Sequence, residues 1–266
     1  MNTHLERAIR VSRRLLDNYA GLHEPEEKLI ADAQSFWSGL SNAGRDGGPA
    51  HWRGQSIFED DARWWAIGAN SLRIFEQMAG ADWLRERPRQ VLDWGCGGGT
   101  CAVHFAPGAA AYYGLDITEA SLGECQRQLL AHGLANFQPV LVPAASPEQA
   151  PAQVPEPLDL VLSTYVFELL PSQEYGRRVL RVMLEMLAPG GLAFVQIKYT
   201  TRRLNSRSYR WGYAKNLGNM TTYYLEEFWE LAAGCGFTPL LLHLEPRQPL
   251  NNDSHFGYFL LRKKEA

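Results

Sequence analysis

The stretch Val91-Leu92-Asp93-Trp94-Gly95-Cys96-Gly97-Gly98-Gly99-Thr100 decides the fold of this chain. Apolar residues that end on a carboxylate are typical of a short buried strand, and the glycines after them predict a tight turn that opens a helix. In such a turn backbone N–H groups approach a ligand without hindrance from Cβ atoms, and the positive end of the helix faces the same place. The stretch therefore predicts a ligand-binding turn.

The spacing Asp-x-Gly-x-Gly-x-Gly within this stretch resembles motif I of the class I S-adenosylmethionine-dependent methyltransferases. In that family the carboxylate and the loop backbone hold the methionine end of the cofactor. The resemblance implies S-adenosyl-L-methionine as the cofactor and these contacts for it: Asp93, Gly95, Cys96, Gly97 and Gly99.

A dinucleotide site is the competing interpretation of the same turn. Residues 97–102 also satisfy Gly-x-Gly-x-x-Gly/Ala. A carboxylate at Asp93 would then face a pyrophosphate, whereas an ammonium-bearing ligand is a suitable partner for that charge. We therefore favour the methyltransferase resemblance over a dinucleotide site, and over a glycine turn with a purely structural role.

Composition limits the class of protein. The 266 residues, of which 45% are hydrophobic and 21% charged, suit one α/β domain with an added subdomain. A net charge of -3 leaves no general basic footprint, so nucleic acid is not an expected partner. The four cysteines form no Cys-x-x-Cys pair, which favours reduced thiols in a cytoplasmic protein and no metal site. No stretch has the apolar length of a transmembrane helix, so no membrane partner is expected.

Residues 1–84 have helical periodicity and no strand signal, and they precede the expected catalytic domain, residues 85–266. This arrangement resembles the N-terminal helical cap or lid of small-molecule methyltransferases. His51, Trp52 and Arg53 stand where such a cap would meet the glycine turn. A Trp face attracts a sulfonium cation and Arg53 pairs with a carboxylate, so both are expected cofactor contacts. Packing within the cap is the alternative for the tryptophan.

A second carboxylate follows the next predicted strand, residues 110–117. Asp116 lies 116 − 93 = 23 residues after Asp93, close to the ~20-residue offset at which an acid takes ribose hydroxyls in βαβ folds. In the family this acid binds the ribose and the next residue, here Ile117, flanks the adenine. The alternative for Asp116 is to cap the following helix, a role that Thr118 is also placed to fill.

The third strand, residues 136–145, departs from the family pattern. An acidic residue often follows this strand and holds the adenine amino group, whereas this chain has Ala144, Ala145 and Ser146. Backbone groups there, or Ser146, are expected to replace the acid.

The next strand, within residues 158–171, resembles motif IV. Thr164 is expected beside the cofactor and Tyr165 beside the reaction centre, because open α/β sheets bind ligands at the carboxyl ends of their strands. Glu168 stands where many relatives carry a histidine. We interpret Glu168 as a solvated residue at a helix start in preference to a catalytic one.

The remaining pattern completes the sheet. Ala188-Pro189-Gly190-Gly191 is similar to the family's turn before strand five, and residues 237–246 and 255–264 predict two final strands. The expected fold is therefore a Rossmann-like, seven-stranded, mostly parallel sheet. Its last strand is antiparallel, helices cover both faces, and the N-terminal helical cap precedes it.

Residues 199–222 distinguish this member of the family. No acid occurs between Met186 and Leu225, while arginines and aromatic residues alternate. Such a loop is expected to recognise an anionic acceptor group. Its expected substrate-binding residues are Arg202, Arg203, Arg207, Tyr209, Arg210 and Trp211. A solvated basic loop, or a contact between copies in a homodimer, is an equal alternative.

The resemblance implies an enzyme that transfers a methyl group from S-adenosylmethionine to oxygen or nitrogen of a small-molecule acceptor. We expect an anionic metabolite or natural-product intermediate. Candidate bases are His255, Tyr165 and His51, although alignment alone can lower the barrier without a base. A peptide or protein methyltransferase, and a non-catalytic methyltransferase-like subunit, are the alternatives.

Overall fold

The computed structural model describes residues 3–40 and 61–265. The helices are α1 (Thr3–Ala20), α2 (Glu26–Leu40), α3 (Asp61–Ala79), α4 (Ala102–Phe105), α5 (Glu119–Ala131), α6 (Gln173–Met186) and α7 (Leu225–Cys235). The strands are β1 (Arg89–Trp94), β2 (Ala109–Asp116), β3 (Phe137–Leu141), β4 (Leu158–Ser163), β5 (Leu187–Lys198), β6 (Phe237–Gln248) and β7 (Asp253–Lys263). Within these described ranges no helix is both long and apolar enough to cross a bilayer.

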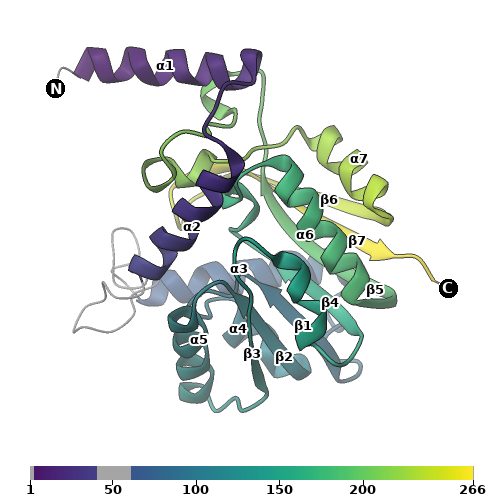
Figure 1. Ribbon diagram of the computed structural model, residues 1–266. Coiled ribbons are helices and arrows are strands. Elements are labelled where there is room, and N and C mark those ends of the chain that lie inside the picture. Colours follow the sequence, from purple (N-terminus) through teal and green to yellow (C-terminus); the bar gives the residue numbers. More distant parts are fainter. Residues whose placement is uncertain (1–2, 41–60, 266) are drawn as a thin grey trace.

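The strands form one seven-stranded sheet in the order β3-β2-β1-β4-β5-β7-β6 (Figure 1). Pairs from β3 through β5 are parallel, while β7 runs antiparallel to both β5 and β6. The predicted sheet is confirmed. Its strand order reverses between β1 and β4, and ligands of open α/β sheets bind at such a switch point.

Helices cover both faces of the sheet, as expected. Alternate strand residues point to opposite faces, so Leu92 packs with α6 and α7 while Val91 packs with α3, α4 and α5. The buried Phe75 of α3 belongs to the same core as Phe194 of β5. Helix α3 is therefore part of the wall of the sheet domain, and α2 lies above the carboxyl ends of the strands (Figure 1).

The Pro-Gly-Gly turn lies inside a strand in the structure, which corrects the prediction of a separate connector. Strand β5 begins at Leu187, and its pairing with β4 shifts register between Leu158 and Leu160. Gly190 absorbs the irregularity at φ 76°, a conformation that residues with a Cβ rarely adopt. Strand β3 also ends earlier than predicted, at Leu141.

Candidate active site

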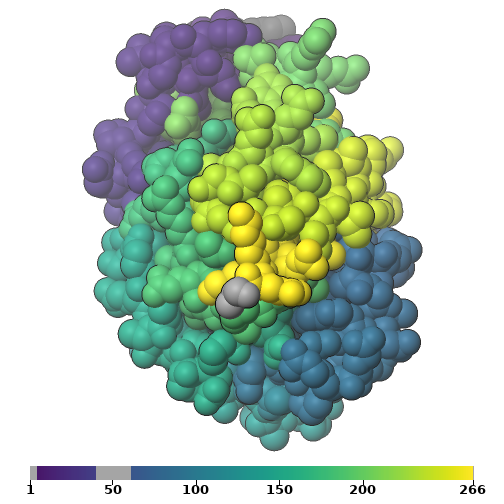
Figure 2. Space-filling model, turned by 90° about the vertical axis from the view of Figure 1, so that its right-hand side faces the viewer, coloured from purple at the N-terminus to yellow at the C-terminus, as the bar shows by residue number. Residues whose placement is uncertain are grey.

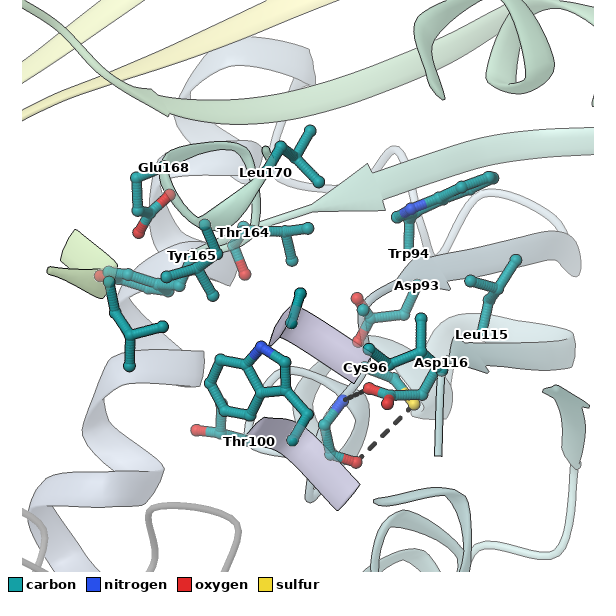
Figure 3. Close-up of a pocket in the computed structure, with 18 of the residues that line it drawn as sticks. Asp93, Trp94, Cys96, Thr100, Leu115, Asp116, Thr164, Tyr165, Glu168 and Leu170 are labelled. Carbon is teal, nitrogen blue, oxygen red and sulfur yellow. Dashed lines mark hydrogen bonds between the residues drawn. The ribbon is translucent and has the colours of Figure 1, made fainter. Parts of the chain in front are cut away.

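A cavity of about 430 Å³ opens at the carboxyl ends of β1, β2 and β4 (Figure 3). Of the residues predicted to contact the cofactor, these line it: Asp93, Gly95, Cys96, Gly97, Asp116, Ile117, Ala144 and Thr164. Gly99 and Ala145 do not. Trp52, Arg53 and His51 lie outside the described residues.

The glycine turn is fastened to the tip of β2. Gly95 and Gly97 have φ values of 76° and 54°, so the chain needs glycine at both positions to make this turn. The N–H groups of Gly95 and Cys96 donate to the carbonyl of Leu115 at 2.8 and 3.0 Å, and the Gly97 N–H donates to Asp116 Oδ2 at 3.0 Å. The turn therefore brings Asp93 and Asp116 to one cavity (Figure 3).

Asp93 is 2% exposed, and the hydroxyl of Tyr112 on β2 donates to its Oδ2 at 2.8 Å. Burial raises the pKa of Asp93 to about 7, the Tyr112 hydrogen bond lowers it, and nearby Asp116 raises it. A carboxylate in this setting is strongly stabilised by a cation placed beside it. The cavity therefore favours a positively charged ligand at this end.

Asp116 is free of the capping role that was its alternative. Thr118 is the N-cap of α5, since its side chain accepts a hydrogen bond from the N–H of Ser121. The second oxygen of Asp116 accepts from the N–H of Thr118 at 3.2 Å. Both oxygens are thus oriented by backbone donors, and the carboxylate lines the cavity.

At the end of β3, the backbone groups of Ala144 that are predicted to hold the adenine already have hydrogen-bond partners within the chain. The Ala144 N–H already donates to Gln34 Oε1 at 3.0 Å, and its carbonyl accepts from the Tyr175 hydroxyl. Ser146 is not among the residues that line the cavity. Gln34 of α2 also donates to the carbonyl of Ile117 at 2.9 Å, so one amide ties α2 to the tips of β2 and β3. The sequence analysis did not identify this residue.

The interpretation of Glu168 as a solvated residue is wrong. Its side chain lines the cavity, the residue is 5% exposed, and within the described part of the chain its Oε2 has no hydrogen-bond partner. Glu168 lies in the short helical turn η6 (Phe167–Leu169), and its carbonyl accepts from the N–H of Thr221. Residues 199–222 therefore pack against η6. Burial raises the pKa of Glu168 to about 7.

A partly buried ion pair between Lys198 and Asp253 lies near Glu168. Lys198 Nζ lies 2.7 Å from both carboxylate oxygens of Asp253, and Lys198 is buried. After burial, the charges of Lys198 and Asp253 act on the pKa of Glu168 in opposite directions, Lys198 lowering it and Asp253 raising it. Because the lysine is paired, it leaves Glu168 with little net positive charge nearby.

The cavity has a roof, by which we mean α2 together with residues 199–222. Trp37 of α2 donates from Nε1 to the Tyr213 hydroxyl at 3.1 Å, and both residues line the cavity. Leu217 and Gly218 line it as well. The segment predicted to bind substrate therefore does reach the cavity, but through residues other than those predicted.

The six predicted substrate-binding residues do not line the cavity. Arg210 Nε and Nη2 donate to Asp17 of α1 at 2.9 and 2.6 Å. The other contacts are cation–π pairs with α1, between Arg207 and Tyr19, Tyr209 and Arg14, and Trp211 and Arg13. Arg202 and Arg203 are exposed. The arginines and aromatic residues of this segment for which these contacts are given therefore bind α1 and not the cavity.

The predicted bases are placed unequally. Tyr165 lines the cavity with a strained φ of 59°, and burial raises the pKa of its hydroxyl well above the usual value, so the hydroxyl stays protonated at neutral pH. His255 does not line the cavity; its ring bonds to Ser254 Oγ at 2.7 Å and packs against Tyr199.

A family model described as "Methyltransferase domain" matches residues 92–193. The ubiquinone biosynthesis O-methyltransferase of Pseudomonas fluorescens is 28% identical over 160 residues, 55% of this chain and 61% of that protein. The match thus spans less than two thirds of that relative.

Solved structures share the fold. The 1,6-didemethyltoxoflavin-N1-methyltransferase of Burkholderia thailandensis, with that molecule and S-adenosylhomocysteine bound, has a TM-score of 0.61, 17% identity and 92% coverage of both chains. The magnesium protoporphyrin IX methyltransferase of Synechocystis PCC 6803, with S-adenosylhomocysteine bound, has a TM-score of 0.60 and 16% identity, covering 88% of this chain and 100% of that one.

Proposed function

We propose that this chain, which belongs to the class I S-adenosylmethionine-dependent methyltransferases, transfers a methyl group to a hydroxyl or amine of a small, largely apolar molecule. The observation that carries this proposal is the cavity at the switch point. It joins two strand-tip carboxylates, Asp93 and Asp116, to a third buried carboxyl group, Glu168, beneath an aromatic roof.

The cofactor end fits S-adenosylmethionine by its donor set. Asp93 is a buried carboxylate whose charge needs a cationic partner, and the methionine ammonium supplies one. Asp116 is held by two backbone donors and offers its carboxylate to the ribose hydroxyls. When bound, the cofactor would supply a methyl group on a sulfonium: the acceptor's oxygen or nitrogen would attack the methyl carbon in line, while the carbon–sulfur bond breaks and the neutral thioether leaves.

The acceptor end favours a neutral or protonated molecule over the anionic one expected from sequence. Among the described residues that line the cavity, every charged side chain is a carboxylate: Asp93, Asp116, Glu168 and Asp253. An acceptor anion would meet these acids without a lining cation to balance them. The surrounding Ile30, Trp37, Leu169 and Tyr213 suit an apolar body.

Glu168 is the residue that we assign to the acceptor's proton. An unpartnered carboxylate oxygen in an apolar cavity accepts a hydrogen bond from the acceptor O–H or N–H and orients its lone pair. With a pKa near 7 the carboxylate is available at neutral pH and retains enough basicity to take the proton as the bond to carbon forms. The roof excludes water from this step.

Calorimetry with S-adenosylmethionine and a labelled-methyl assay test the proposal together. We expect binding, and label transfer to hydroxylated or aminated aromatic compounds in preference to carboxylated analogues of the same size. Binding without transfer to any small molecule, but with transfer to peptides, would favour the peptide methyltransferase. Absence of binding would favour a non-catalytic partner subunit.

A further inference from the structure

Helix α1 is amphipathic, but it packs against the protein through its polar side. At 3.6 residues per turn its apolar side chains share one half of the helix surface. All of the large ones are exposed, by 40% to 69%: Leu5, Ile9, Val11, Leu15, Leu16 and Tyr19. A surface helix normally buries this face, whereas the described part of the chain leaves it exposed, which marks the face as a candidate docking surface.

The opposite, polar half of α1 attaches the helix to the protein. The side chain of Asp17 has no exposed surface and forms the ion pair with Arg210, and Asn18 donates to the carbonyl of Ser208 at 2.9 Å. Figures 1 and 2 show α1 at one end of the molecule, next to the green segment that follows β5. The contacts are specific, so α1 is held with its apolar face outward rather than simply undocked.

A basic groove runs beside the apolar face. It lies between α1 and the helical turn η7 (Leu204–Ser206), and Arg7, Arg10 and Arg14 line it together with Glu6. Arg202 and Arg203, which directly precede η7, are exposed as well. An apolar face bordered by arginines is the pattern of helices that lie in the interface of an anionic bilayer.

We propose that α1 seats the protein on an anionic lipid surface, with its apolar half among the acyl chains and the exposed Arg7 and Arg10 at the headgroup phosphates. Charge complementarity favours this occupant over a second copy, because two arginine-bordered helices brought face to face would repel each other. The expectation of no membrane partner rested on the absence of a spanning segment, and an interfacial helix needs none. The inference does not depend on the proposed reaction.

Flotation of the full chain with vesicles tests the inference. Vesicles of phosphatidylcholine alone are compared with vesicles of equal parts phosphatidylcholine and phosphatidylglycerol, at low and high salt. We expect flotation with the anionic vesicles only, weakened by salt. The double variant I9Q/L16Q should bind the vesicles at least about tenfold more weakly, because each substitution removes a large apolar side chain that would be buried in the bilayer. The double variant R7Q/R10Q should lose about fivefold per arginine.

The matched control is L130Q, which removes an apolar side chain that is 58% exposed on α5 and should float like the wild type. Far-UV circular dichroism and thermal unfolding check that all variants keep their fold. Absence of flotation with either vesicle, or flotation that I9Q/L16Q leaves unchanged, overturns the inference. So does a dimer in light scattering that I9Q/L16Q converts to monomer while no vesicle binds, since the face would then belong to a second copy.

Discussion

The hydroxyl of Tyr112 and the carboxylate of Asp93 form a hydrogen bond of 2.8 Å between neighbouring strands, at the floor of the cofactor end. This bond lowers the pKa of an acid that burial raises to about 7. In the variant Y112F the carboxylate loses its donor and its pKa rises further. We therefore expect cofactor affinity near neutral pH to fall about three- to tenfold, with recovery as pH rises.

Calorimetry across the neutral pH range measures this effect. Binding of a cation beside Asp93 favours its ionised form, so wild-type affinity should rise with pH up to about 7 and then level off, with proton release below that point. Y113F is the control, since Tyr113 lies in the core on the opposite face of the sheet. An affinity that is independent of pH in both proteins would contradict the assignment of Asp93 to the cationic end.

The buried Asp93 should also lower the free energy of unfolding near neutral pH. Its pKa is 3.8 in the unfolded chain and about 7 in the folded one, so the folded protein keeps a proton that the unfolded chain releases. Stability is therefore full below the unfolded pKa and is lost as pH rises toward 7, by at most about 4 kcal/mol at ~1.4 kcal/mol per pKa unit. D93N should bind no cofactor yet unfold at higher denaturant concentration than the wild type at about pH 8.

Urea unfolding of D93N at about pH 8 and about pH 4 checks this prediction, because the gain should vanish at the lower pH. D82N is the control, since the Asp82 side chain is 79% exposed. A D93N protein that is less stable than the wild type at both pH values would contradict this prediction. It would show that the contacts of the Asp93 side chain, rather than its charge, determine the effect on stability.

Glu168 should govern turnover without governing cofactor binding. E168Q keeps the size of the side chain but cannot take a proton, so kcat should fall about 10²- to 10⁴-fold while cofactor affinity stays within about twofold. The wild-type kcat should rise with an apparent pKa near 7. The control is E174Q, because Glu174 is an exposed acid on α6. Unchanged turnover in E168Q would mean that alignment alone drives the reaction.

The fold, and the convergence of Asp93 and Asp116 on one cavity, were predictable because their signals are local. Asp93 and the glycines after it form one continuous strand and turn, and the pairing of β1 with β2 brings Asp116 beside them. The carboxyl ends of parallel neighbours meet at one edge, so spacing along the chain predicts proximity in space.

The surroundings of Glu168, which we propose as the acceptor end, were not predictable, because they are assembled from distant segments. Glu168 lies in η6, against which residues 199–222 pack through the hydrogen bond from Thr221. Likewise the arginine-rich segment looked like an anion site because its partner, Asp17, lies 193 residues away along the chain. Composition reveals a charge, but only tertiary packing reveals whether that charge is already paired.

That pairing gives a last prediction, for Arg210. Arg210 binds Asp17 through its side chain and its backbone N–H, so R210Q leaves a buried carboxylate with the N–H as its remaining donor among these contacts. Docking of α1 should weaken by about 3 kcal/mol, and amide exchange in α1 should accelerate accordingly. Because Arg210 does not line the cavity, KM for the acceptor should stay within about twofold in detergent-free, vesicle-free buffer. The control is R203Q, which replaces an exposed arginine of the same segment and should change neither the amide exchange in α1 nor KM. A tenfold rise in the KM of R210Q, with unchanged amide exchange in α1, would contradict this prediction. It would place Arg210 in the acceptor site, because the side chain would then have to leave Asp17 when the acceptor binds.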